Sequence, residues 1–128
     1  MARRILLIDD DHDFVEATKM LLEAKGFEVS SAFGGEEGIS KAISEKPDII
    51  LLDVMMSHPA EGFDIARKLN SGEETKHIPL VLITGIRKEM NLPFGFAPDK
   101  NMLPVKAVLE KPVKPQLLLK VIEECISS

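Results

Sequence analysis

The sequence predicts an α/β fold in which a parallel sheet is covered by helices on both faces. Two observations carry this prediction. Short apolar runs alternate along the chain with longer amphipathic stretches, and the length of 128 residues suits one domain of this kind. A short uninterrupted apolar run is typical of a strand that is buried on both faces. We therefore expect residues 1–128 to form a single domain.

The first part of the chain predicts two strand-helix units. Residues 4–8 (RILLI) form an apolar run and are expected to be a buried strand. Residues 12–25 repeat apolar side chains at three- and four-residue steps, as a helix does, and Gly26 is a typical helix end. Residues 27–32 alternate in polarity, which favours a strand nearer an edge of the sheet. Residues 35–45 predict a second helix.

The most apolar strand is expected at residues 49–52, directly before Asp53. A loop that contains Ser57, His58, Pro59 and Gly62 should follow, and then a helix over residues 63–70. Residues 78–83 predict a fourth strand that leads to Thr84, with Pro79 near its start, where a missing donor is tolerated.

Residues 105–109 predict a weaker fifth strand, and residues 114–126 predict a final helix with one apolar stripe. The stretch 86–104 departs from the alternation because it contains three prolines and loses helical periodicity. We expect the fourth helix of the fold, which belongs in this stretch, to be short or irregular.

Composition excludes several classes of protein. A net charge of −5 argues against a protein that coats nucleic acid, because such binding is driven by positive charge. The single cysteine, Cys125, excludes an intramolecular disulfide and is compatible with a reducing compartment. The apolar runs are far shorter than the roughly twenty residues that span a bilayer. We therefore expect the chain in the cytoplasm.

Polar residues stand where the predicted strands end. Asp9 and Asp10 follow the first strand, Asp53 the third, Thr84 the fourth and Lys111 the fifth. The carboxyl ends of parallel strands meet at one edge of a sheet, where ligands bind in such folds. We expect these five residues to converge there.

The chemistry of this set suits phosphoryl transfer. Three clustered carboxylates repel one another unless a cation lies among them, and oxygen ligands favour Mg²⁺, with Mn²⁺ or Ca²⁺ as substitutes. Lys111 offers a point charge to a phosphate oxygen, and the Thr84 hydroxyl can donate to another. Such groups stabilise a transferring phosphoryl group, with Asp53 as a candidate nucleophile.

The same residues carry a resemblance to the receiver domains of two-component response regulators, over essentially the whole chain. Four segments resemble the motifs of that family in order: residues 5–11 (ILLIDDD), residues 47–56 (PDIILLDVMM), residues 81–85 (VLITG) and residues 110–112 (EKP). The resemblance implies a flavodoxin-like five-stranded parallel sheet with strand order 2-1-3-4-5.

The resemblance also implies roles for individual residues. Asp53 would accept a phosphoryl group from a histidine kinase or phosphotransfer domain, and the domain would catalyse its own phosphorylation and dephosphorylation without being a conventional enzyme. Mg²⁺ would be bound directly by Asp10, Asp53 and the backbone carbonyl of Met55, and through water by Asp9. Lys111 would pair with Asp53 and then with the phosphate, and Thr84 would move toward it. Phosphorylation would switch protein contacts.

Three departures from the family pattern concern the output of the signal. Ser57 stands where a proline is usual, and Gly62 stands one residue later than the usual glycine. Val108 replaces the aromatic switch residue, so the usual coupling of threonine to aromatic residue cannot operate. The stretch from Thr84 to Lys111 is also longer than is typical.

Other interpretations stay open at this point. The run Asp9 to Asp11 could simply cap the following helix. A phosphatase-like enzyme could use the same aspartate, although it would need an acid where Met55 stands. A degenerate receiver could act as a constitutive protein-binding module, as Val108 would favour. Since nothing here predicts a DNA-reading element, we expect output through protein contact, with an unknown downstream protein or a fused domain.

Overall fold

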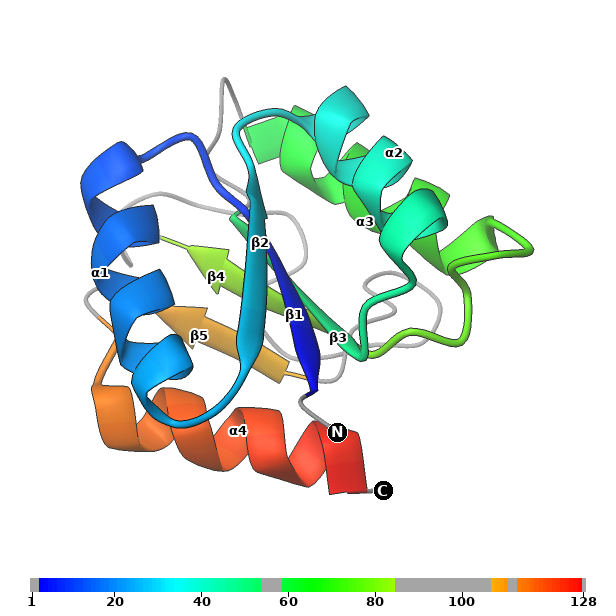
Figure 1. The fold of residues 1–128 in the computed structure, drawn as a ribbon. Helices are drawn as coiled ribbons and strands as arrows, with labels where there is room; N and C mark the ends of the chain where they lie inside the picture. The colour runs from blue at the N-terminus through cyan, green and yellow to red at the C-terminus, as the bar shows by residue number, and fades with distance from the viewer. Residues whose placement is uncertain (1–2, 54–58, 85–106, 111–112, 128) are drawn as a thin grey trace.

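The computed structural model describes residues 3–53, 59–84, 107–110 and 113–127. Five strands and four helices lie within these residues, and Figure 1 shows how they are arranged. None of the described helices is long and apolar enough to cross a membrane. The strands are β1 (Arg4–Ile8), β2 (Glu28–Ala32), β3 (Ile49–Asp53), β4 (Leu80–Thr84) and β5 (Ala107–Glu110); the helices are α1 (His12–Ala24), α2 (Gly35–Glu45), α3 (Pro59–Ser71) and α4 (Pro115–Ser127).

The five strands form one parallel sheet in the order β2-β1-β3-β4-β5. This order confirms the expected flavodoxin-like topology. The three central strands are apolar apart from Arg4 at the start of β1, Asp53 at the end of β3 and Thr84 at the end of β4, because helices cover both faces of a parallel sheet. The carboxyl ends of the strands lie at one edge, and the connections that leave this edge carry the candidate site.

The sheet separates two hydrophobic cores, since successive strand residues point to opposite faces. Helices α2 and α3 cover one face, and α1 and α4 cover the other (Figure 1). The first core contains Leu6, Ile8, Ile50, Leu52, Leu80 and Leu82 from the strands with Ala42, Ile65, Ala66 and Leu69 from the helices. The second contains Ile5, Leu7, Ile49, Leu51, Val81, Ile83 and Leu109 with Val15, Leu22, Leu118 and Ile122.

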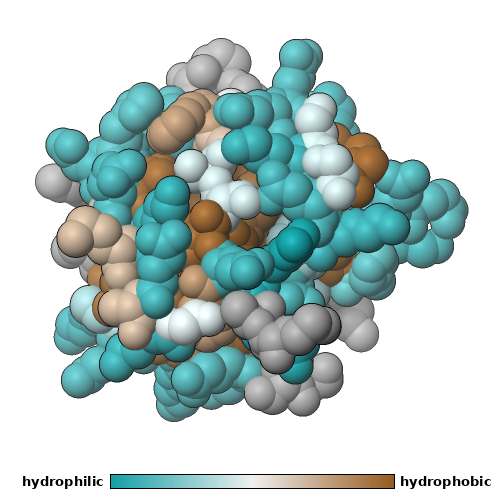
Figure 2. Space-filling model, in the orientation of Figure 1, coloured by the Kyte–Doolittle hydropathy of each residue, from teal (hydrophilic) through white to brown (hydrophobic). Residues whose placement is uncertain are grey.

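Strand β2 lies at an edge of the sheet, as its alternating sequence predicted. Its residues are more polar and less buried than those of the central strands. Glu28 pairs with Arg4 of β1 at 3.3 Å, and Lys41 of α2 donates to the carbonyl of Ser31. Figure 2 shows that this side of the molecule is mostly hydrophilic, with hydrophobic residues gathered in its central part. Charged groups along an edge strand discourage pairing with another chain.

Helix α1 ends one residue earlier than predicted, with Lys25 as its C-cap. Gly26 follows in the left-handed region, at φ +95°, where a side chain would be strained. The backbone N–H of Gly26 donates to the carbonyl of Glu23, and that of Phe27 donates to the carbonyl of Leu22. This pair of hydrogen bonds is a Schellman motif, and it turns the chain directly into β2.

Two element starts differ from the prediction. Helix α3 begins at Pro59 rather than at residue 63, because proline is favoured at the first position of a helix, where its missing N–H costs nothing. The expected loop is therefore shorter, and Gly62 lies inside the helix. Strand β4 begins at Leu80 rather than at residue 78. Pro79 cannot donate to the ladder, although its carbonyl accepts the N–H of Ile50 at 3.0 Å.

The last strand was expected at residues 105–109, whereas β5 extends to Glu110. The irregular stretch expected at residues 86–104 lies outside the described residues, as do Ser57 and His58. Val108 lies within β5, where it is paired in register with Leu82 of β4.

Candidate functional site

Three aspartates meet at the carboxyl edge of the sheet. Asp9, Asp10 and Asp53 each offer one carboxylate oxygen, and these three oxygens lie within 4.8 Å of one another. Asp9 and Asp53 are almost fully buried, at 0% and 2% exposure, whereas Asp10 is exposed. The sequence predicted that these three residues converge, and the structure confirms it.

Sheet register brings the cluster together. Strands β1 and β3 are parallel neighbours, and Ile8 is paired with Leu52. The next residues along the two strands are Asp9 and Asp53, so their side chains emerge side by side at the same edge. Asp9 is also held on its other side, because its backbone N–H donates to the carbonyl of Ala32 in β2 at 3.0 Å.

The aspartates at the end of β1 divide two tasks. Asp11 is the N-cap of α1, and its carboxylate accepts the backbone N–H of Phe14 at 3.2 Å. The backbone N–H of Asp11 donates in turn to Oδ1 of Asp9 at 2.9 Å. Helix capping therefore explains Asp11 and leaves Asp9 and Asp10 to the cluster.

The donor set of the cluster fits a hard divalent cation. All three side chains offer carboxylate oxygens, and two of them are removed from water, where like charges repel strongly. One exposed member leaves the cluster accessible from solvent. Oxygen donors that keep water positions open are the ligands that Mg²⁺ prefers, and Mn²⁺ accepts the same set. The described residues thus contain an acidic cluster whose donor oxygens could hold a divalent cation.

The remaining predicted site residues are only partly covered by the structure. Thr84 ends β4, directly after Ile83, which is paired with Asp53. Its backbone therefore lies at the same edge of the sheet as the cluster. Met55 and Lys111 lie outside the described residues.

Comparison with known proteins decides the family. The sequence pattern of the response regulator receiver domain matches residues 5–123. The chain is a response regulator receiver domain. It therefore belongs to a family that acts in two-component phosphorelay signalling, and neither the acidic cluster nor the family match favours a degenerate receiver.

Curated relatives share this receiver domain. The chain is 32% identical to the protein PilH of Pseudomonas aeruginosa over 124 residues, which cover 97% of this chain and 98% of PilH. It is 47% identical to the response regulator PleD of Caulobacter vibrioides over 90 residues, which cover 67% of this chain and 19% of PleD. The receiver domain thus spans about a fifth of PleD and nearly all of PilH.

Solved structures share the fold over nearly the whole chain. A CheY-like response regulator receiver domain protein from Methanospirillum hungatei is 28% identical, with a TM-score of 0.83, and the match covers 99% of this chain and 95% of that one. A two-component response regulator from Clostridium difficile is 26% identical, with a TM-score of 0.82, and the match covers 98% and 96% of the two chains.

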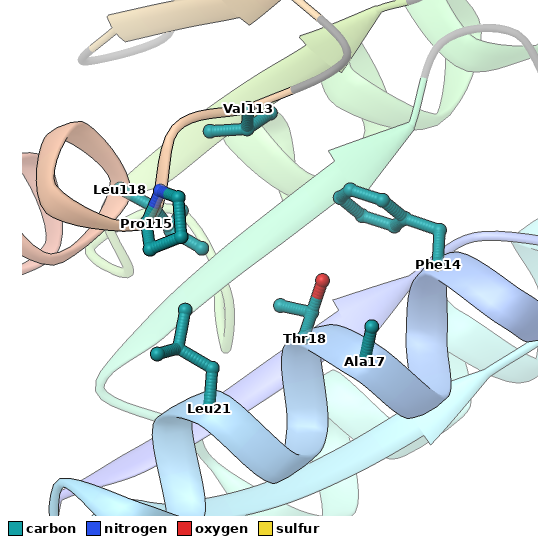
Figure 3. A pocket seen from close by; sticks show the side chains of 7 residues that line it. All are labelled: Phe14, Ala17, Thr18, Leu21, Val113, Pro115 and Leu118. Carbon is teal, nitrogen blue, oxygen red and sulfur yellow. The ribbon is translucent and has the colours of Figure 1, made fainter.

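An apolar pocket of about 240 Å³ opens between α1 and the start of α4 in this receiver domain. Figure 3 shows its α1 side chains facing those of the segment that leads into α4 across the pocket. Phe14, in the first turn of α1, lies at one end of the lining contributed by that helix. Its lining residues are Phe14, Ala17, Thr18, Leu21, Val113, Pro115 and Leu118.

One feature beside the cluster could not be found from the sequence. The ring of His12 stacks on the ring of Phe33, with centroids 4.1 Å apart and an interplanar angle of 13°. His12 is exposed, and it is the first residue of α1. No local pattern predicts this contact, because His12 begins α1 and Phe33 follows β2, and the two rings meet only when β1 pairs with β2.

Proposed function

We propose that Asp53 is the phosphoacceptor of this receiver domain. The observation that carries the proposal is the burial of Asp53 beside Asp9 and Asp10 at the carboxyl edge of the sheet. A carboxylate oxygen of Asp53 would attack the phosphorus of a phosphohistidine donor. The bond between phosphorus and the donor nitrogen would break, and the imidazole would keep the electron pair, which leaves an aspartyl phosphate.

We propose that the cation is Mg²⁺, held directly by Asp10, Asp53 and the backbone carbonyl of Met55, and through water by Asp9. When bound, it would supply positive charge to the phosphoryl oxygens and to the clustered carboxylates. The oxygen-only donor set and the three converging carboxylates support this proposal.

We assign Lys111 and Thr84 the roles implied by the family motifs. The ammonium group of Lys111 would pair with Asp53 before phosphorylation and with a phosphoryl oxygen afterwards. The hydroxyl of Thr84 would donate to another phosphoryl oxygen, and the shift of this residue would change the protein contacts of the domain. The position of Thr84 at the end of β4, next to the strand that carries Asp53, supports its assignment.

We propose that the donor is a histidine kinase or a phosphotransfer protein of the cytoplasm. The apolar pocket between α1 and the start of α4 supports a protein donor, because an apolar surface can pack against a helix and a small phosphate compound has none. Ala17→Arg would fill this pocket with a charged side chain. We expect it to slow transfer from the kinase that phosphorylates the wild-type chain fastest, and to leave phosphorylation by acetyl phosphate unchanged.

Intact mass spectrometry tests the phosphoacceptor. The wild-type chain and Asp53→Asn are incubated with acetyl phosphate, with and without Mg²⁺. Asp64→Asn is the matched control, because Asp64 is an exposed carboxylate on α3 whose ion pair is with Lys68. We expect one phosphoryl adduct in the wild type and in the control, only with Mg²⁺, and none in Asp53→Asn.

Two results would count against the proposal. An adduct that persists in Asp53→Asn would place the acceptor elsewhere. The absence of any adduct in a folded wild-type chain that binds Mg²⁺ would favour the degenerate receiver that acts as a binding module.

A further inference from the structure

The turn between β1 and α1 is supported from two sides. On the side of the cluster, Oδ1 of Asp9 accepts the backbone N–H of Asp11 at 2.9 Å. On the far side, the ring of His12, the first residue of α1, stacks on Phe33. Asp10 lies between these supports along the chain, and it is the exposed member of the cluster.

The two supports respond differently to a cation. The Asp9 carboxylate would be attracted to a bound cation, which competes with its hydrogen bond to the turn. The stack of two rings uses no carboxylate, so cation binding leaves it unchanged. If the stack holds the turn in one conformation, Asp10 is already in place when a cation binds, and binding does not have to order the turn.

Phe33 is itself firmly placed. Its backbone N–H donates to Oε1 of Glu37 in the first turn of α2 at 3.0 Å. The preceding residue, Ala32, accepts the backbone N–H of Asp9 and is fully buried. Phe33 remains 39% exposed as a residue, so burial in the core does not account for its position. The β2–α2 connection thus offers a fixed surface against which His12 rests.

We propose that His12 and Phe33 are positioning residues for the cation site: their stack holds the turn that carries Asp10. This inference rests on the cation site proposed above and adds two residues to it. Neither ring touches the cation or the phosphoryl group. The stack acts by keeping the Asp10 carboxylate within reach of Asp53, so that binding a cation does not require the turn to be ordered at the same time.

Isothermal titration calorimetry with Mg²⁺ tests the proposal on the full chain, since it needs no phosphorylation. We expect Phe33→Ala to raise the Kd for Mg²⁺ by about three- to tenfold, the range that an aromatic stack is worth. Phe33→Tyr keeps the ring and should keep the wild-type Kd. Met20→Ala is the matched control, because Met20 is a 68% exposed hydrophobic residue of α1 and takes no part in the stack.

A second readout separates positioning from stability. In phosphorylation by acetyl phosphate, the Mg²⁺ concentration for half-maximal rate should rise in Phe33→Ala by the same factor as the Kd. The rate at saturating Mg²⁺ should stay within about twofold of the wild type. His12→Phe retains a ring pair and should behave like Phe33→Tyr. Far-UV circular dichroism confirms that each variant is folded.

The outcomes are distinguishable. A Kd for Phe33→Ala within twofold of the wild type, with only a lower melting temperature, would overturn the inference and leave the phosphoacceptor proposal intact. A wild-type chain that shows no Mg²⁺ binding would overturn the cation site itself, and this inference with it.

Discussion

Asp11 donates its backbone N–H to Oδ1 of Asp9 at 2.9 Å. One buried carboxylate thus shapes the turn after β1 and also belongs to the acidic cluster. Its oxygens are kept out of water beside Asp53, where the free energy of the folded state depends on charge as well as on hydrogen bonding. Substitutions that separate charge from hydrogen bonding can therefore measure the two contributions.

Asp9→Asn separates them. The carboxamide oxygen can still accept the N–H of Asp11, while one of three clustered charges is lost. Two like charges at the separation in this cluster repel by about 3 kcal/mol at an effective dielectric constant of about 20. We expect the free energy of unfolding in metal-free buffer to rise by about 1 to 2 kcal/mol, and the extra stability conferred by Mg²⁺ to fall. Urea denaturation with and without Mg²⁺ measures both.

Asp48→Asn is the control for this experiment. Asp48 also accepts a backbone N–H, that of Arg4 at 2.8 Å, but its side chain is 39% exposed and it lies at the opposite edge of the sheet from the cluster. Its free energy of unfolding should change by less than about 0.5 kcal/mol. A loss of stability in metal-free Asp9→Asn would show that the hydrogen bond, and not the repulsion, governs this position.

Asp11→Ala removes the N-cap of α1. The backbone N–H of Phe14 loses its acceptor, whereas the bond from the backbone of Asp11 to Asp9 remains. We expect a loss of about 1 kcal/mol in the free energy of unfolding and a Kd for Mg²⁺ within about twofold of the wild type. Asp11→Ser supplies another capping oxygen and should recover most of the stability. A large loss of Mg²⁺ affinity in Asp11→Ser would contradict the division of tasks among the aspartates.

Gly38→Ala tests the packing of α2 on β1. A Cβ at Gly38 would lie 2.5 Å from Cδ1 of Ile8, whose side chain is fully buried and cannot move aside freely. We expect the free energy of unfolding to fall by about 1 to 3 kcal/mol. Gly34→Ala is the matched control, because no atom lies within 4 Å of a Cβ there. As Gly34 is the N-cap of α2, its substitution should cost at most about 1 kcal/mol.

A double substitution identifies the contact. Ile8→Val removes Cδ1, so it should cost less stability in the Gly38→Ala background than in the wild type. Strictly additive losses, measured by urea denaturation, would show that the helix relaxes away from Ile8 and that the close approach is not required.

Thr75→Val tests a buried hydrogen bond beyond α3. Thr75 is buried, at 4% exposure, and its hydroxyl donates to the carbonyl of Leu69 at 2.6 Å. Removing this donor should lower the free energy of unfolding by about 1 to 2 kcal/mol. Thr75→Ser keeps the hydroxyl and should lose less. Equal losses in the two variants would assign the effect to the methyl group and its packing.

Much of the fold could be predicted because it is local. The apolar runs and the helical spacing mark β1, β2, β3, α1 and α2 within a residue or two, since burial on one or two faces requires those periods. Element starts at prolines were harder. Pro59 begins α3 where a loop was expected, because the same residue is compatible with both and only packing chooses between them.

The sequence alone identified the residues that we expect to carry the chemistry of this receiver domain: Asp9, Asp10 and Asp53 stand after apolar runs, in the motifs of the family. Only the tertiary structure decided how they are used. The pairing of Ile8 with Leu52 brings two buried carboxylates together, and Asp11 caps a helix instead of joining them. The stack of His12 on Phe33 likewise depends on sheet register. Contacts between distant parts of a chain follow from pairing and packing, which a local pattern of residues does not specify.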